Sequence, residues 1–230
     1  IGYFVYQNNA VEKKSIQIPP IQGNTPMPAD ENEPTPPGSN RIIDSGRHIL
    51  LPMDEGRHNK SRREWWYFNT VFNDPDSDLQ GYSLVVSFNK MKYFDIRFLK
   101  PDNLFVILYD VNGTSYNFAT LNQRRGTLQS TGPGVDVTFQ NSWVKGTYPS
   151  WHVHAVNDEK GFVIDMNYTA DFLPVWVEGR SANLPIAKFV AGDYYVPRCR
   201  VTGTMTWNGK QYHVAGTGYH DHVWENNVPR

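Results

Sequence analysis

The stretch "GYHDHVW" near the C-terminus holds the residues of this chain that are best suited to acid–base chemistry. Alternate residues of a β-strand point to the same side, so Tyr219 and Asp221 would share one face and His220 and His222 the other. An apolar site raises the pKa of a carboxylic acid, which can then protonate a substrate near neutral pH. We therefore take Asp221 as the candidate acid. Its alternative role is structural, as an acceptor of backbone or tryptophan N–H groups.

The histidines raise the alternative of a metal site. His152 and His154 repeat the H-x-H spacing of His220 and His222, and two such pairs on adjacent strands would offer four ring nitrogens to a metal ion. A simple meander of strands does not bring the pairs together, and His152 and His154 then lie on an exposed strand face. The main prediction therefore contains no metal and no cofactor. A metal-dependent enzyme that uses both pairs is the alternative.

The run "EWWYF" at residues 64–68 is the second unusual feature. On a strand, Trp65 and Tyr67 would point one way and Glu64 and Trp66 the other. One face is expected to meet the core and the other to lie near Asp221. Aromatic clusters build cores and also line apolar binding sites. The residues predicted to bind a ligand are Trp65, Trp66, Tyr67, Trp224 and Tyr194, with Glu64, His220 and His222 in support.

The elements that position these residues are predicted to be strands. Apolar residues alternate with polar ones over residues 82–89, which is typical of a half-buried strand. Asn112-Gly113 and Asn208-Gly209 lie between such runs and suit type I′ hairpin turns. A third hairpin is expected across residues 157–161. No window has the apolar stripe of a helix, so we predict an all-β, antiparallel up-and-down β-barrel, with a two-sheet sandwich as the alternative.

Composition excludes several classes of function. The 230 residues are 39% hydrophobic, which is enough for a sizeable core. A net charge of -1 gives no basic surface for nucleic acid, so no nucleic-acid partner is predicted. The single cysteine, Cys199, excludes an internal disulfide and a C-x-x-C site, and it is expected to be a small core residue.

The N-terminal part differs in character from the rest. Residues 1–18 begin with "IGYFVYQNN", which is typical of the end of a membrane anchor or leader. Residues 19–40 contain seven prolines and predict a Pro-rich linker. Residues 41–230 form the predicted domain, and 41–63 is expected to be a lead-in loop packed against it. We expect an extracytoplasmic or membrane-associated protein, held to the membrane through the N-terminal anchor.

The C-terminal passage "YYVPRCRVTGTMTWNGKQYHVAGTGYHDHVWE", taken together with "EWWYF", resembles the AttH-like and carotenoid 1,2-hydratase (hydroxyneurosporene synthase) family over about residues 60 to 225. The resemblance implies a lipocalin-like, calycin-type fold of two consecutive β-barrels. This chain corresponds to the first barrel. The second barrel of the same protein is then an expected partner.

The same resemblance implies the function. Members hydrate carotenoid ends or a prenyl group, and fungal relatives cyclise polyketides. We therefore expect the lipocalin-like barrel to bind a large hydrophobic molecule of prenyl, carotenoid or polyketide type. Tyr219 and Asp221 match the Tyr-x-Asp pair on which the hydratases depend, which favours a hydro-lyase, or else an isomerase or cyclase. The family's His-x-Trp pair is replaced by residues 191–195, "AGDYY", where Asp193 offers a second carboxylate. A non-catalytic domain of the cell envelope that binds lipid or isoprenoid is the alternative.

Overall fold

The computed structural model describes residues 40–44, 47–59, 61–91, 102–121, 128–176, 182–184, 187–189 and 191–225. The leader expected at residues 1–18 and the linker expected at 19–40, except Asn40, lie outside the described residues. The described part consists of β-strands and two short 3-10 helices, so the prediction of an all-β fold is confirmed. None of its helices has the length and the apolar character that a membrane crossing requires.

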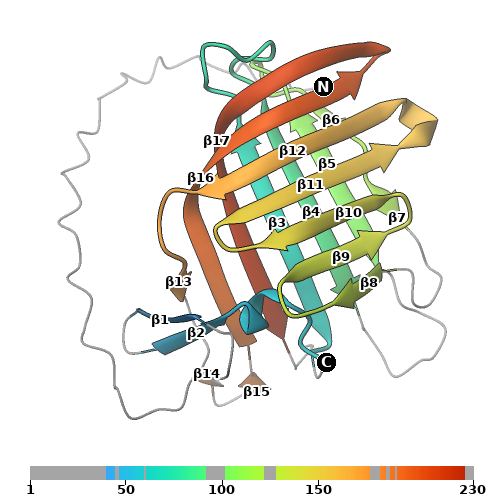
Figure 1. Cartoon of the computed structure of the whole chain (residues 1–230). Coiled ribbons are helices and arrows are strands. Elements are labelled where there is room, and N and C mark those ends of the chain that lie inside the picture. Colours follow the sequence, from blue (N-terminus) through green and yellow to red (C-terminus); the bar gives the residue numbers. More distant parts are fainter. Residues whose placement is uncertain are drawn as a thin grey trace, which may run out of the picture.

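The strands and helices follow one another along the chain as shown in Figure 1. Their bounds are β1 Asn40–Asp44, β2 Arg47–Leu51, η1 Met53–Glu55, β3 Arg63–Val71, β4 Ser83–Met91, β5 Asn103–Tyr109, β6 Ser115–Asn117, β7 Thr120–Leu121, β8 Leu128–Thr131, β9 Val135–Phe139, β10 Ser142–Thr147, β11 Ser150–Asn157, η2 Asp158–Lys160, β12 Phe162–Ala170, β13 Val175–Trp176, β14 Ala182–Leu184, β15 Ala187–Phe189, β16 Ala191–Trp207 and β17 Lys210–Glu225.

The main sheet of the described residues has thirteen strands. Its continuous path is β6-β5-β4-β3-β17-β16-β12-β11-β10-β9-β8, while β13 pairs with β16 and β7 with β5. The hairpin expected across residues 157–161 joins β11 to β12. Antiparallel pairing of β3 with β17 joins the first long strand to the last. The sheet curls so that β9–β12 lie across β3–β5 (Figure 1), which gives the antiparallel, barrel-like meander predicted from the sequence.

The core lies inside the curl of the sheet. Buried and half-buried residues alternate along β3, and this places the fully buried side chains of Trp66 and Phe68 inside. The ring of Phe68 packs edge-on against Tyr168 of β12, with centroids 5.1 Å apart. Thr70 Oγ1 lies 2.6 Å from the Tyr168 hydroxyl oxygen. Burial of one such aromatic side chain contributes roughly 1.5–3 kcal/mol, so these contacts hold β3 against the opposite part of the sheet.

The two predicted Asn-Gly turns have different conformations. Asn208 and Gly209 have φ angles of 51° and 73°, as a type I′ turn requires. Gly113 also has a positive φ of 82°, but Asn112 does not. There, Asp110 Oδ1 accepts hydrogen bonds from the backbone N–H groups two and four residues ahead, both at 2.9 Å. The predicted hairpin is present, but the type I′ turn is wrong because the Asp110 carboxylate stabilises a longer turn.

The segment 41–63 contains more regular structure than a loop. β1 and β2 form a separate two-stranded hairpin, and η1 follows β2 after one residue. Glu55 in η1 is 0% exposed, and its main-chain oxygen accepts a hydrogen bond from Trp66 Nε1 at 3.0 Å. The lead-in does pack against the domain, but the loop prediction is wrong. β1 and β2 pair with each other, and the contact of Glu55 with Trp66 holds η1 against β3.

Candidate functional site

The strand β17 carries different side chains on its two faces. His220 and His222 are 0% exposed and point into the curl of the sheet. Tyr219 and Asp221, at the alternate positions, are half-buried and point to its outer side. The four polar residues of "YHDH" are thus divided between two separate environments.

Tyr219 and Asp221 lie beside aromatic residues of the two neighbouring strands. In the register of the sheet, Asp221 is paired with Tyr67 of β3 and with Tyr195 of β16. The Tyr219 ring lies edge-on to Tyr67, with centroids 6.2 Å apart, and stacks on Tyr195 at 5.9 Å. Trp65 is two residues from Tyr67 on the same side of β3. We call Trp65, Tyr67, Tyr195, Tyr219 and Asp221 the outer aromatic face.

The Asp221 carboxyl group is poorly solvated. Its Oδ1 is buried and has no hydrogen-bond partner among the described residues, and the same is true of Asp193 Oδ1. Burial, reinforced by the charge of Asp193, raises the pKa of Asp221 to about 7, against the opposing effects of Tyr219 and Trp65. Burial and the charge of Glu225 raise the pKa of Asp193 to about 6. Asp221 therefore has a pKa near neutrality and lies close to a second carboxyl group, Asp193, whose pKa is also raised.

His220 lies in an aromatic environment inside the sheet. Its ring stacks on Phe68 with centroids 4.2 Å apart and lies 4.7 Å from the ring of Trp151. Nδ1 donates to the Tyr67 carbonyl oxygen at 3.0 Å, and Nε2 lies 3.4 Å from the Tyr194 hydroxyl. Burial lowers the pKa of His220 to about 3. His220 is therefore a neutral core residue, with both ring nitrogens facing polar atoms.

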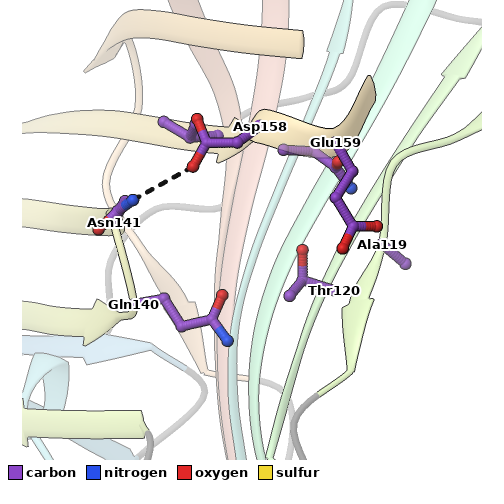
Figure 2. Close-up of a pocket in the computed structure, with 8 residues that line it drawn as sticks. Ala119, Thr120, Gln140, Asn141, Asp158 and Glu159 are labelled. Atoms are coloured by element: carbon purple, nitrogen blue, oxygen red, sulfur yellow. Dashed lines mark hydrogen bonds between the residues drawn. The ribbon is translucent and has the colours of Figure 1, made fainter. Parts of the chain in front are cut away.

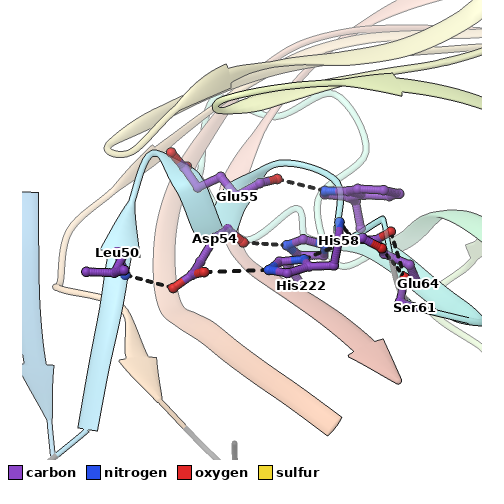
Figure 3. A network of polar contacts seen from close by, with 8 residues as sticks. Leu50, Asp54, Glu55, His58, Ser61, Glu64 and His222 are labelled. Atoms are coloured by element: carbon purple, nitrogen blue, oxygen red, sulfur yellow. Dashed lines mark hydrogen bonds and ion pairs between the residues drawn. The ribbon is translucent and has the colours of Figure 1, made fainter. Parts of the chain in front are cut away.

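Glu64 is the centre of a buried polar network (Figure 3). Its Oε1 accepts a hydrogen bond from the His58 backbone N–H at 2.7 Å and lies 3.1 Å from His58 Nδ1 and 3.2 Å from His222 Nε2. The Ser61 hydroxyl donates to Oε2 at 3.1 Å. Burial alone would raise the pKa of Glu64, but the two histidines outweigh it and lower the pKa to about 2. We call His58, Glu64 and His222 the inner polar cluster.

Glu55 forms a separate buried acid site on the same side of the sheet. Its Oε1 accepts hydrogen bonds from the Tyr148 backbone N–H at 2.7 Å and from Trp151 Nε1 at 3.0 Å. Its Oε2 has no hydrogen-bond partner in the described part of the chain. Burial raises the pKa of Glu55 to about 7. Sequence reasoning missed Glu55 and His58, although an acid and a histidine within ten residues of "EWWYF" were a usable signal.

The structure does not bring the four H-x-H histidines together. His152 and His154 contact Asp165 of β12, with Nε2–Oδ1 and Nδ1–Oδ2 distances of 2.6 and 3.0 Å. These side chains are 39% and 23% exposed, whereas His220 and His222 are fully buried. β12 and β16 also lie between β11 and β17. The four-histidine metal site is therefore wrong, because strand order and side-chain alternation separate the pairs.

The aromatic residues predicted to bind a ligand also divide between two sides. Trp65 and Tyr67 belong to the outer aromatic face, near Asp221 as expected from alternation. Trp66 and Tyr194 are 0% exposed inside the sheet, where Trp66 stacks on His222. Trp224 stacks on His58 with ring centroids 3.7 Å apart. The inner aromatic side chains contact one another and the histidines, which leaves the outer group as the better candidate for a ligand surface.

A pocket of about 400 Å³ lies elsewhere, between β7, the turn before β10 and the end of β11 (Figure 2). Polar side chains such as Gln140, Asn141, Asp158 and Glu159 form most of its lining. Asn141 Nδ2 donates to Asp158 Oδ2 at 3.3 Å. None of the predicted site residues lines it, and its polar lining does not suit a hydrophobic ligand.

Comparison with known proteins gives a family and a fold. A family model described as AttH-like matches residues 43–229. No curated protein sequence matches the chain. The crystal structure described as that of an AttH from Nitrosomonas europaea is similar, with a TM-score of 0.65, 16% identity, and coverage of 82% of this chain and 59% of that one.

The crystal structure of kievitone hydratase from Nectria haematococca is also similar, with a TM-score of 0.51 and 14% identity, and the match covers 78% of this chain and 53% of that one. At these identities the likeness concerns the fold, and it confirms the lipocalin-like, antiparallel fold. This chain spans between half and three-fifths of the length of the two proteins.

Proposed function

The chain belongs to the AttH-like family, and on that premise we propose that it binds a large hydrophobic molecule of prenyl, carotenoid or polyketide type and hydrates an isolated alkene in it. The observation that carries this proposal is the Asp221 carboxyl group on the outer aromatic face, with a buried Oδ1 that lacks a partner among the described residues. A buried polar atom without a partner costs free energy, and a role toward a ligand accounts for that cost. The reaction named in kievitone hydratase supports hydration as the reaction class.

The proposed reaction uses three parts of the outer aromatic face. Asp221 donates its proton to one alkene carbon, and the other carbon becomes a tertiary carbocation. The faces of Trp65, Tyr67 and Tyr195 stabilise this cation by cation–π attraction. Water adds to the cation and returns a proton to the Asp221 carboxylate, so alkene and water give an alcohol and the acid is restored.

The surroundings of Asp221 support its use as a proton donor. Burial favours the neutral acid, and the nearby charge of Asp193 acts in the same direction. The Tyr219 hydroxyl interacts with the carboxyl group, and the ring of Tyr219 is held between two other tyrosines. We assign Tyr219 the role of orienting the acid.

The position of this face bears on how a ligand would be enclosed. It lies on the outer side of the curled sheet, so the barrel interior is not the proposed binding site. The chain spans 59% and 53% of its two structural neighbours. We therefore include a second lipocalin-like barrel of the whole protein in the proposal, as the partner that closes the site over the ligand.

The test is the turnover of prenylated aromatics and acyclic polyenes by the whole protein in water labelled with oxygen-18. We expect one labelled oxygen in the product, and a loss of about 10²- to 10⁴-fold in rate for Asp221→Asn, since amides do not donate protons as general acids do. Asp221→Glu should retain part of the rate. Asp165→Asn, on the exposed side of β12, is the matched control. Unchanged turnover in Asp221→Asn would remove Asp221 as the acid.

A binding domain without catalysis is the second candidate, and the sequence "AGDYY" at 191–195 in place of the family's His-x-Trp pair favours it. In that case the same ligands would quench the fluorescence of Trp65, yet no labelled alcohol would form. Trp65→Phe and Tyr67→Leu would weaken binding, and Asp221→Asn would leave it unchanged.

A further inference from the structure

The inner polar cluster is on the opposite side of β17 from Asp221. From its geometry we infer that His58, Glu64 and His222 bind one divalent transition-metal ion, with zinc as the expected ion. One candidate ligand atom from each of the three residues lies within 4.8 Å of the other two. The hydration proposed above uses none of these atoms, so the two proposals can fail independently.

The hydrogen bonds of His222 leave a place for a cation. Its Nδ1 lies 2.8 Å from the Asp54 carbonyl oxygen, which can only accept, so Nδ1 carries a hydrogen. In the neutral ring, Nε2 then presents a lone pair to Glu64 Oε1 at 3.2 Å, which is also an acceptor. Two acceptors at this distance need a metal ion or a proton between them. Both side chains are 0% exposed, so this place lies away from solvent.

His58 also directs a ring nitrogen at Glu64 Oε1. Its Nε2 lies 3.5 Å from Asp54 Oδ1, while Nδ1 faces Glu64 Oε1 at 3.1 Å (Figure 3). Each histidine thus directs one ring nitrogen at Glu64 and the other at an oxygen of Asp54. Histidines that bind metals nearly always donate their second ring N–H to a carboxylate or a backbone carbonyl. Asp54 provides one of each and is therefore a positioning residue.

The ligand types favour zinc, and the distances are compatible with it. Bonds of roughly 2.0–2.1 Å in tetrahedral geometry place neighbouring ligand atoms roughly 3.3 Å apart. The observed separations of Glu64 Oε1 from the two nitrogens, 3.1 and 3.2 Å, are close to this. Two imidazoles and one carboxylate form a common zinc ligand set, with a fourth position left for water.

The aromatic neighbours hold the ligand rings in place. His58 stacks on Trp224, with centroids 3.7 Å apart and planes 5° from parallel. His222 stacks on Trp66 at 4.7 Å and 17°. His58 is 23% exposed at the edge of the cluster, which gives an ion a path from solvent. A site whose ligands are oriented before binding loses little entropy when the ion arrives.

The experiment uses tag-free protein stripped with a chelator and dialysed. Elemental analysis and calorimetric titration with zinc chloride should give about one equivalent bound. Cobalt(II) in its place should give the intense visible absorption of a tetrahedral site. We expect His58→Gln and Glu64→Gln each to weaken zinc binding by tenfold or more, and Asp54→Asn by roughly 10- to 100-fold. The matched control is His152→Gln, an exposed histidine on β11 that also contacts a carboxylate, and it should bind zinc as the unaltered protein does.

If the stripped protein is folded and takes up no zinc, cobalt, iron or manganese, the inference is wrong. The group between Glu64 and His222 is then a proton. Equal zinc affinity in His58→Gln and in His152→Gln would overturn it as well. Far-UV circular dichroism checks the fold of each variant. His58 is at the edge of the cluster, so its variant remains informative even if Glu64→Gln does not fold.

Discussion

Glu55 is a buried acid whose ionisation is coupled to folding. Its pKa rises from 4.5 to about 7 on burial, so the folded protein binds this proton more tightly than the unfolded chain does. The resulting stabilisation is fully present below pH 4.5 and is lost as the pH rises through 7. Glu55→Gln keeps an oxygen acceptor for the Tyr148 and Trp151 N–H groups and cannot ionise. Relative to the unaltered protein, it should therefore gain about 3 kcal/mol of unfolding free energy between pH 4.5 and pH 8.

Urea unfolding at several pH values measures this difference. Glu159→Gln, which changes an exposed glutamate in η2, serves as the control for the substitution itself. If the difference in unfolding free energy between Glu55→Gln and the unaltered protein does not change with pH, then Glu55 has the same protonation state in the folded and unfolded protein over this range.

Single residues differ in how well the sequence identified them. Tyr219 and Asp221 were placed on one side of a strand by alternation alone, and the structure has them there. Glu64 and His222 were both named as supporting residues, and the structure brings them into contact. His58 could not be assigned, because its partner His222 lies 164 positions away in the chain and only the pairing of β3 with β17 brings them together.

The spacing of glycines in "GTGY" reflects close contact between strands. A Cβ at Gly216 would lie 2.1 Å from the Val71 carbonyl oxygen and 2.9 Å from Phe72 Cα, both backbone atoms that cannot turn aside. Overpacking of this kind typically costs about 1–3 kcal/mol. We expect Gly216→Ala to lower the free energy of unfolding by at least that amount.

Denaturant unfolding checks this, with Gly56→Ala as the matched control, since the nearest atom to its added Cβ is 3.4 Å away. An unchanged midpoint in Gly216→Ala would show that β3 can move away from β17 without cost. In that event, the close contact between β3 and β17 would not require a glycine at position 216.

Strands were easier to predict than their connections. The period-two pattern identified β4 and the hairpins, because alternation is local and strong. Asn208-Gly209 has the predicted turn, whereas Asp110 changed the turn at Asn112-Gly113 through its own hydrogen bonds. The polar lead-in concealed β1, β2 and η1, and η1 is held in place by Trp66 of another element.

The arrangement of the whole sheet predicts which strands resist local unfolding most strongly. β17 pairs along its length with β16 and over much of it with β3, so its backbone groups are bonded on both sides. Within the described residues β8 pairs only with β9 and β6 only with β5. Amides hydrogen-bonded on an edge strand exchange through local opening, while amides in the middle of a sheet exchange through larger unfolding events.

In hydrogen-exchange mass spectrometry, peptides from β3 and β17 should therefore exchange roughly 100-fold or more slowly than those from β6 and β8. Peptides from β11, in the middle of the opposite part of the sheet, should resemble β17. Equal protection in β8 and β17 would contradict an open sheet edge at β8, and it would indicate that further chain or a partner pairs with that strand.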